Sequence, residues 1–238
     1  MNAPEESLVQ LRSAVARGDG PGVVAALATM PLVEVAQLAG DGLLVALAQG
    51  TEGAASWAEA CARVLEERGW EGDDDLARQL AGALGREPAP TLRALPVDLE
   101  ELSWILEGDG LSGGGRIDLR SGEVWPETVE GYDEGEEPED AGDPDHWLYV
   151  ECEGSHEGYR DMEAFVSMVD DPERADRLSI AIDGRGAFRR FKDVLARWPE
   201  EQARYFLFSE ERRRARARSW LVSAGIAATP AAALKSGG

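Results

Sequence analysis

The sequence predicts an α+β fold, with an all-helical N-terminal module followed by a small antiparallel three-stranded sheet packed by C-terminal helices. Two observations support this. Prolines at expected helix starts and glycines after expected helix ends punctuate the first 86 residues, as short helices require. Short apolar runs then flank a Ser121-Gly122 turn, and amphipathic patterns follow them. We expect an all-helical module at 1–86, a linker at 87–96, an α+β domain at 97–226 and a disordered tail at 227–238.

Six helices are expected in the N-terminal module. The Gly18-Asp19-Gly20 and Gly40-Asp41-Gly42 sequences are expected to form turns between them, and their spacing of 22 residues hints at stacked helix pairs. The prolines of residues 86–90 favour extended backbone and thus a linker. The expected helices are Leu8–Arg17, Pro21–Thr29, Pro31–Ala39, Leu43–Gln49, Ser56–Arg68 and Asp73–Leu84.

The second domain begins with a helix whose N-cap is Asp98. Strands are expected at Arg116–Leu119, Glu123–Trp125 and Trp147–Cys152. Between them, residues 123–145 hold 11 acidic and no basic side chains, a composition that predicts a solvated loop. Three helices should follow, one of them capped by Asp171-Pro172-Glu173 and one ending at Trp198-Pro199, and a final helix should begin after Ser209-Glu210-Glu211.

The charge is strongly negative and unevenly distributed. The 238 residues carry a net charge of −22, yet 11 of the 24 basic residues lie between Arg185 and Arg218. A field this negative repels nucleic acid and anionic membranes at long range, which disfavours both as partners. No apolar run approaches the roughly 20 residues that span a bilayer. Two cysteines far apart, Cys61 and Cys152, indicate a reducing compartment, so we expect a cytoplasmic protein.

The most concentrated chemistry lies where a Gly184-Arg185-Gly186 turn opens onto a basic, aromatic helix. Phe188, Phe191, Leu195 and Trp198 recur at helical spacing and should face inward, which leaves the basic side chains exposed. In one interpretation, the backbone N–H groups, the helix dipole and the arginines at this helix start together bind an anion, a phosphate or a carboxylate. In the alternative interpretation, the glycines only permit a tight turn and the arginines pair with the domain's own carboxylates. The candidate anion-binding or partner-binding residues are Arg185, Arg189, Arg190 and Lys192.

Two other groups of residues are weaker candidates for a functional site. The run Arg212–Arg218 could bind nucleic acid, but its i, i+4 spacing fits ordinary pairing on a solvated helix. His146, Cys152 and His156 suggest zinc, but successive strand side chains alternate between faces and do not supply four convergent ligands. We therefore expect no metal and no cofactor, and the sequence identifies no catalytic residue.

Several motifs resemble, in order, the bacterial uncharacterised protein family 0158. They are Ile117–Val124, Tyr159–Phe165, the Gly-Ala-Phe-Arg-Arg-Phe-Lys-Asp run at 186–193, and the segment from Arg212 through Trp220-Leu221 to Gly225-Ile226. The resemblance covers roughly residues 97–226. It implies a domain but no activity, because the family has none established.

The function expected from these features is that of a cytoplasmic binding or regulatory protein that recognises an anionic group or a protein partner through the basic helix start. One alternative is an enzyme for a phosphorylated or nucleotide substrate, with Arg185 and Arg190 clamping charge and Asp118 or Asp161 as base. Another is an acidic DNA mimic, or an inhibitor of a basic protein, that acts through residues 123–145.

Overall fold

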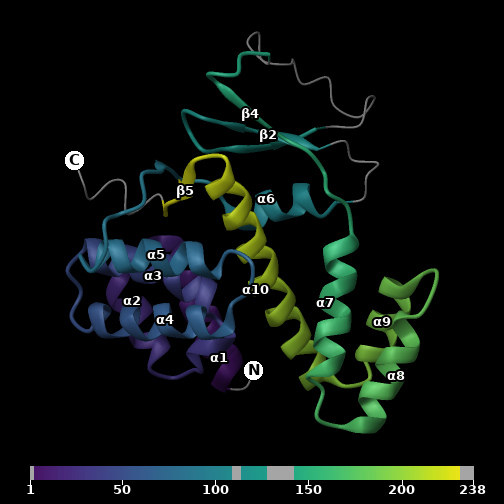
Figure 1. Ribbon diagram of the computed structural model, residues 1–238. Coiled ribbons are helices and arrows are strands. Elements are labelled where there is room, and N and C mark those ends of the chain that lie inside the picture. The colour runs from purple at the N-terminus through teal and green to yellow at the C-terminus, as the bar shows by residue number, and fades with distance from the viewer. Residues whose placement is uncertain (1–2, 109–113, 128–141, 231–238) are drawn as a thin grey trace.

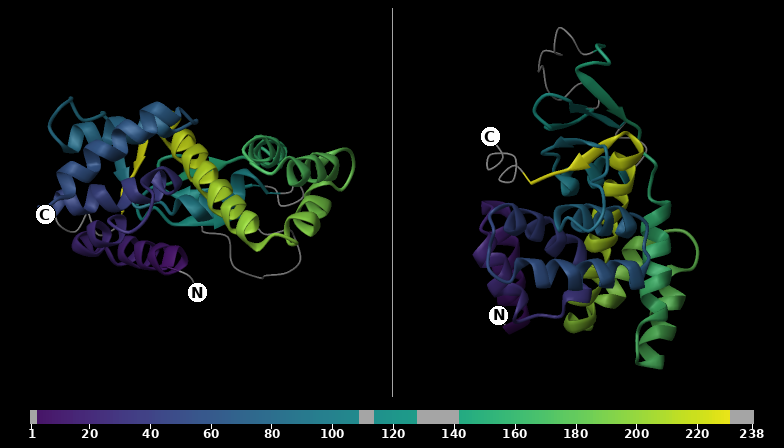
Figure 2. Two further views of the ribbon diagram at one scale, coloured as in Figure 1. Left: turned by 90° about the horizontal axis from the view of Figure 1, so that it is seen from below. Right: turned by 60° about the vertical axis from the view of Figure 1, so that its left-hand side comes forward.

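The computed structural model describes residues 3–108, 114–127 and 142–230. The predicted α+β class is confirmed. The long helix α10 (Pro199–Ser223) runs through the middle of the molecule, as Figure 1 shows, with the N-terminal helices along one side and α7, α8 and α9 along the other. The antiparallel sheet lies beyond the C-terminal end of α10. Figure 2 shows the same arrangement from two further directions. The described residues include no helix that is both long and apolar enough to cross a bilayer.

The N-terminal module is all-helical, as predicted. Its core is aliphatic, with Leu11, Leu27, Leu43, Leu65 and Leu80 almost completely buried. Burying each such side chain contributes about 1.5–3 kcal/mol. The elements are α1 (Ala3–Arg17), α2 (Gly20–Leu27), a 3-10 turn (Leu32–Glu34), α3 (Ala36–Ala48), α4 (Ala54–Arg68) and α5 (Asp73–Ala83).

The prediction of a turn at Gly40-Asp41-Gly42 is wrong, because α3 continues through these residues. These glycines permit close helix packing. A Cβ on Gly40 would lie 2.5 Å from the Leu76 side chain, and one on Gly42 would lie 2.8 Å from Val23. The two Gly-Asp-Gly sequences therefore do not mark equivalent turns, and the stacked helix pairs stay a prediction.

The three expected strands form the antiparallel sheet, in the order β3 (Val124–Pro126), β2 (Gly115–Asp118), β4 (Trp147–Val150). Its inner face contributes Ile117, Val124 and Val150 to a core shared with α6 (Leu99–Leu106) and the last turns of α10. Of the C-terminal helices, which were predicted to pack against the sheet, only α10 contributes to this core. The other helix of the core is α6, which precedes the sheet in the sequence.

Two strands were not expected. β1 (Arg93–Leu95) and β5 (Ile226–Ala228) pair in parallel and join the expected linker to the start of the expected tail. Residues 93–95 and 227–228 are therefore part of the folded structure. Three-residue strands carry too little pattern to be recognised in sequence. Residues 231–238 of the expected tail, and 128–141 of the expected acidic loop, lie outside the described residues. The division into two domains at 87–96 stays a prediction.

The remaining helices form a third cluster beside the first half of α10. Phe165, Phe191, Leu195 and Tyr205 are buried in it, and Phe188 and Trp198 pack against it, so the inward aromatic face predicted for 188–198 is confirmed. The final helix begins at Pro199 rather than after Ser209-Glu210-Glu211. The other elements are α7 (His156–Ser167), α8 (Pro172–Ile182) and α9 (Ala187–Leu195).

The two cysteines differ in their surroundings, which leads to a prediction about their reactivity. Burial, and to a smaller extent the charge of Glu211, raises the pKa of the Cys61 thiol far above its ordinary value, whereas Cys152 is half-buried at the strand end. Thiolate is the reactive form. We expect one fast-reacting thiol in a disulfide-reagent titration of the native protein at pH 8 and two in denaturant. Equal native rates for Cys61 and Cys152 would contradict this.

Candidate functional site

The turn between α8 and α9 presents the basic helix start to solvent. Gly184 and Gly186 both have φ +76°, so each uses the left-handed backbone region that glycine adopts at little cost. Arg190 holds the turn from within, because its guanidinium donates hydrogen bonds to the carbonyl oxygens of Ala181 (3.2 Å), Asp183, Gly184 and Arg185. The structure therefore gives Arg190 an intramolecular role as the clamp of this turn.

The other three candidate side chains extend outward. Arg185, Arg189 and Lys192 are exposed, and the Arg189 side chain is 90% accessible. Arg189 has a carboxylate neighbour in Asp193, at 4.0 Å along its own helix. Such an exposed pair contributes only about 0–1 kcal/mol. Within the part of the chain that the structure describes, no carboxylate pairs with Arg185 or Lys192. We call Arg185, Arg189 and Lys192 the α9 basic surface.

The start of α9 adds a partial positive charge. Its N-cap is Gly186, which has no side chain to accept the first N–H groups, and its first turn contains no acidic residue. By contrast, α6 and α8 begin with Asp98 and Asp171, whose carboxylates accept those bonds. The dipole of α9 and the α9 basic surface therefore favour the same sign of ligand, an anion.

The arginines of α10 behave differently, and the expectation of a solvated Arg212–Arg218 helix is wrong. On one face of α10, Arg218 is completely buried and pairs with Asp41 on α3 at 2.6 Å, and Arg214 pairs with the second oxygen of the same carboxylate at 2.9 Å. Glu211 accepts hydrogen bonds from the backbone N–H groups of Gln37 (2.7 Å) and Leu38 (3.0 Å). Burial raises the pKa of Glu211, although the nearby Arg68 opposes this.

A second face of α10 binds the opposite side of the molecule. Asp161 on α7 is fully buried and pairs with Arg212 and with Arg216, the latter at 2.8 Å. Glu107, just after α6, accepts a hydrogen bond from Arg216 Nε at 2.7 Å, and its other oxygen lies 3.2 Å from Arg213. We call these contacts, together with those of Asp41 and Glu211, the α10 ion-pair network. It connects α10 to α3, α6 and α7.

This arrangement distinguishes the arginines of α10 from the α9 basic surface. The α10 arginines at 204, 212, 213, 214, 216 and 218 each have a carboxylate partner. The α9 basic surface remains accessible. Sequence reasoning missed the α10 ion-pair network because its acidic partners lie up to 177 residues away. The interspersed alanines Ala215 and Ala217, both buried, were the available signal of a covered helix.

In the enzyme alternative, Asp118 or Asp161 acts as the base, and both carboxylates already have partners within the fold. Asp161 is held in the α10 ion-pair network, and Asp118 lies on β2 with His146 at 3.2 Å. Slight burial raises the pKa of Asp118. Hydrogen bonds from the backbone N–H groups of Arg120 and Ser121 outweigh this effect and hold the pKa below its ordinary value. Among the described residues, no three His, Cys, Asp or Glu side chains converge as metal ligands.

Among the residues that the structure describes, two of the clefts lie away from the α8–α9 turn. One of about 520 Å³ lies between α1, the β1–α6 connection and α10, and one of about 280 Å³ lies between α6, α10 and the start of α7. Neither is lined by residues of the α8–α9 turn.

Fold and surface together define an α+β protein with a helical N-terminal module and an exposed cationic helix start. The profile of the Uncharacterised protein family (UPF0158) matches residues 133–235, which include α7 to α10 and the α9 basic surface. The UPF0158 protein PA5073 of Pseudomonas aeruginosa is 26% identical over 130 residues, covering 55% of this chain and 84% of the relative. The predicted resemblance is confirmed. No solved structure matches the chain.

Proposed function

We propose that this is a cytoplasmic binding protein that docks an acidic segment of a partner protein on the α9 basic surface. The separation of the cations is the observation that carries the proposal. The arginines of α10 each pair with a carboxylate of the chain, whereas Arg185, Arg189 and Lys192 keep their charge accessible on a turn that Arg190 clamps. A preorganised backbone removes the cost of ordering the turn when its cationic side chains bind a carboxylate surface. The free thiols of Cys61 and Cys152 support the cytoplasmic assignment.

The surroundings of the turn favour a macromolecule over a small anion. The α8–α9 turn lines neither cleft, and small ligands are held in concave sites. Ile180, in the last turn of α8, is 66% exposed and adds apolar area beside the turn. A partner segment in which acidic side chains flank an apolar residue would be complementary to this surface.

The test is a binding titration with a fluorescein-labelled octaglutamate peptide at low ionic strength. The triple variant Arg185→Glu/Arg189→Glu/Lys192→Glu should bind about 5- to 150-fold more weakly than the native protein, since three exposed charge pairs contribute roughly 1–3 kcal/mol together. Its thermal stability should change little, because all three side chains are exposed.

A matched control reverses three exposed arginines of the N-terminal module, Arg17→Glu/Arg63→Glu/Arg86→Glu, and changes the net charge equally. We expect it to retain most of the binding. If both triple variants lose affinity alike, the effect is one of net charge and the proposal fails. Stabilisation of the native protein by inorganic phosphate, abolished only in the α9 variant, would instead identify a small-anion site and would also overturn it.

A further inference from the structure

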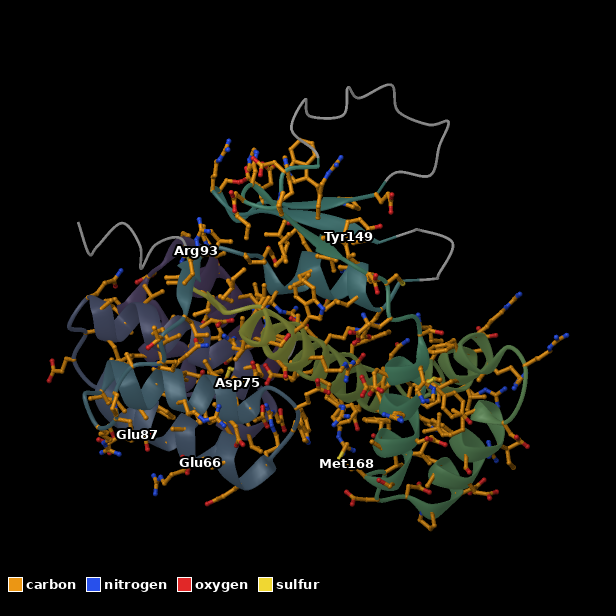
Figure 3. All side chains as sticks on the ribbon, turned by 45° about the horizontal axis from the view of Figure 1, so that its top comes forward. Glu66, Asp75, Glu87, Arg93, Tyr149 and Met168 are labelled. Carbon is orange, nitrogen blue, oxygen red and sulfur yellow. The ribbon has the colours of Figure 1, made fainter. Side chains whose placement is uncertain are left out.

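The outer face of the antiparallel sheet carries exposed aromatic side chains. Arg116 on β2 pairs with Trp125 on β3 and with Tyr149 on β4, so these three side chains form one row across the sheet. Trp125 is 41% and Tyr149 56% exposed, although both are large aromatic residues. Figure 3 labels Tyr149 at the sheet. Side chains of opposite faces alternate along a strand, and Val150 and Ile117 fill the core instead.

A guanidinium already stacks on this face. Arg116 lies over the ring of Trp147, with its Cζ 5.3 Å from the ring centroid, and Trp125 meets the same ring edge-on at 6.0 Å. The face of an aromatic ring attracts cations through its quadrupole. The surface is therefore chemically suited to guanidinium and ammonium groups, while the outer rings of Trp125 and Tyr149 remain accessible.

Two carboxylates, those of Glu127 and Glu151, lie near Tyr149 in the aromatic row. Glu127 accepts a hydrogen bond from the Tyr149 hydroxyl at 3.1 Å, and this contact, with Glu151 nearby, raises the pKa of Tyr149. Aromatic faces bordered by carboxylates are complementary to cations and repel the phosphates of nucleic acid.

We infer that this face, formed by Trp125, Arg116, Tyr149 and Glu127, is a docking surface for a lysine- or arginine-rich segment of a partner protein. The cationic side chains stack on Trp125 and Tyr149 and pair with Glu127 and Glu151. This surface is separate in space and opposite in charge preference from the α9 basic surface, so it does not depend on the function proposed for α9.

The experiment measures anisotropy of a labelled octalysine peptide with the full-length chain. The variant Trp125→Ala/Tyr149→Ala leaves every charge in place and should weaken binding about tenfold, because two cation–π contacts of roughly 0.5–1 kcal/mol each are lost. Tyr149→Phe should keep most of the affinity, since the ring remains. The control Phe206→Ala removes an aromatic side chain of similar exposure (49%) from α10 and should have no effect.

Unchanged affinity in Trp125→Ala/Tyr149→Ala would show that the peptide responds only to net negative charge and would overturn the inference. So would tighter binding of a labelled oligothymidine than of octalysine. Sedimentation of the native chain tests a second copy as the occupant. A dimer that the double variant dissociates would replace the partner segment by self-association and would equally refute the inference.

Discussion

Asp41→Asn should lower the free energy of unfolding by about 3–5 kcal/mol, the cost of removing one partner from a buried ion pair. The substitution keeps the size of the side chain but leaves Arg214 and Arg218 facing a neutral amide. Arg218 has no solvent exposure, and its Nη1 already lacks a hydrogen-bond partner. Water therefore cannot reach the Arg218 guanidinium unless the packing between α3 and α10 opens. Urea unfolding followed by circular dichroism measures the effect.

Asp74→Asn is the matched control. Asp74 pairs with Arg78 at 3.8 Å on the surface of α5, where its side chain is 70% exposed. Exposed pairs contribute about 0–1 kcal/mol, so the control should lose no more than that. If both substitutions cost the same, the α10 ion-pair network does not stabilise the contact between α10 and the N-terminal module.

Gly72→Ala should be comparably damaging, for a steric reason. Gly72 is the N-cap of α5 with φ +81°, and a Cβ there would lie 1.9 Å from the carbonyl oxygen of Ala215 on α10. Two backbones thus meet at this point, and neither can rotate away as a side chain can. We expect a loss of at least about 3 kcal/mol, from the left-handed backbone together with overpacking. Thermal and urea unfolding measure it.

Gly50→Ala separates the two causes. Gly50 has φ +65° and nothing within 4 Å of a built Cβ, so alanine there pays only the backbone cost of roughly 1–2 kcal/mol. A Gly72→Ala protein as stable as Gly50→Ala would show that α5 and α10 do not approach this closely.

The fold was predictable where local chemistry decides it. Asp98 and Asp171 cap their helices as the sequence indicates, because the carboxylate of an N-cap residue with extended backbone accepts hydrogen bonds from the first helical N–H groups. The Ser121-Gly122 turn joins the expected hairpin, with Gly122 at φ +83°. The prediction failed at Gly40 and Gly42, where contacts with Leu76 and Val23 from other helices select glycine inside α3. Tertiary packing there outweighs helix propensity.

The candidate site was predictable in part for the same reason. The alternation of aromatic and basic residues in α9 correctly separates a buried face from an exposed one. Nothing local shows that Arg190 turns back to the carbonyl oxygens of α8, or that Arg216 reaches Asp161 across 55 residues of sequence. A run of arginines looks the same in the sequence whether its side chains pair with carboxylates of distant residues or are exposed to solvent.

The central claim is that the α10 arginines are paired within the fold, whereas the α9 basic surface is free to bind an acidic partner. Its most direct test is the nuclear magnetic resonance spectrum of the arginine Nε–H groups at neutral pH, with and without octaglutamate peptide. Arg212, Arg216 and Arg218, whose Nε–H groups donate hydrogen bonds within the fold, should give slowly exchanging signals that the peptide leaves unchanged. Arg185 and Arg189 should exchange rapidly alone and shift on addition of peptide. Shifts at the α10 arginines, with none at Arg185 or Arg189, would contradict the account.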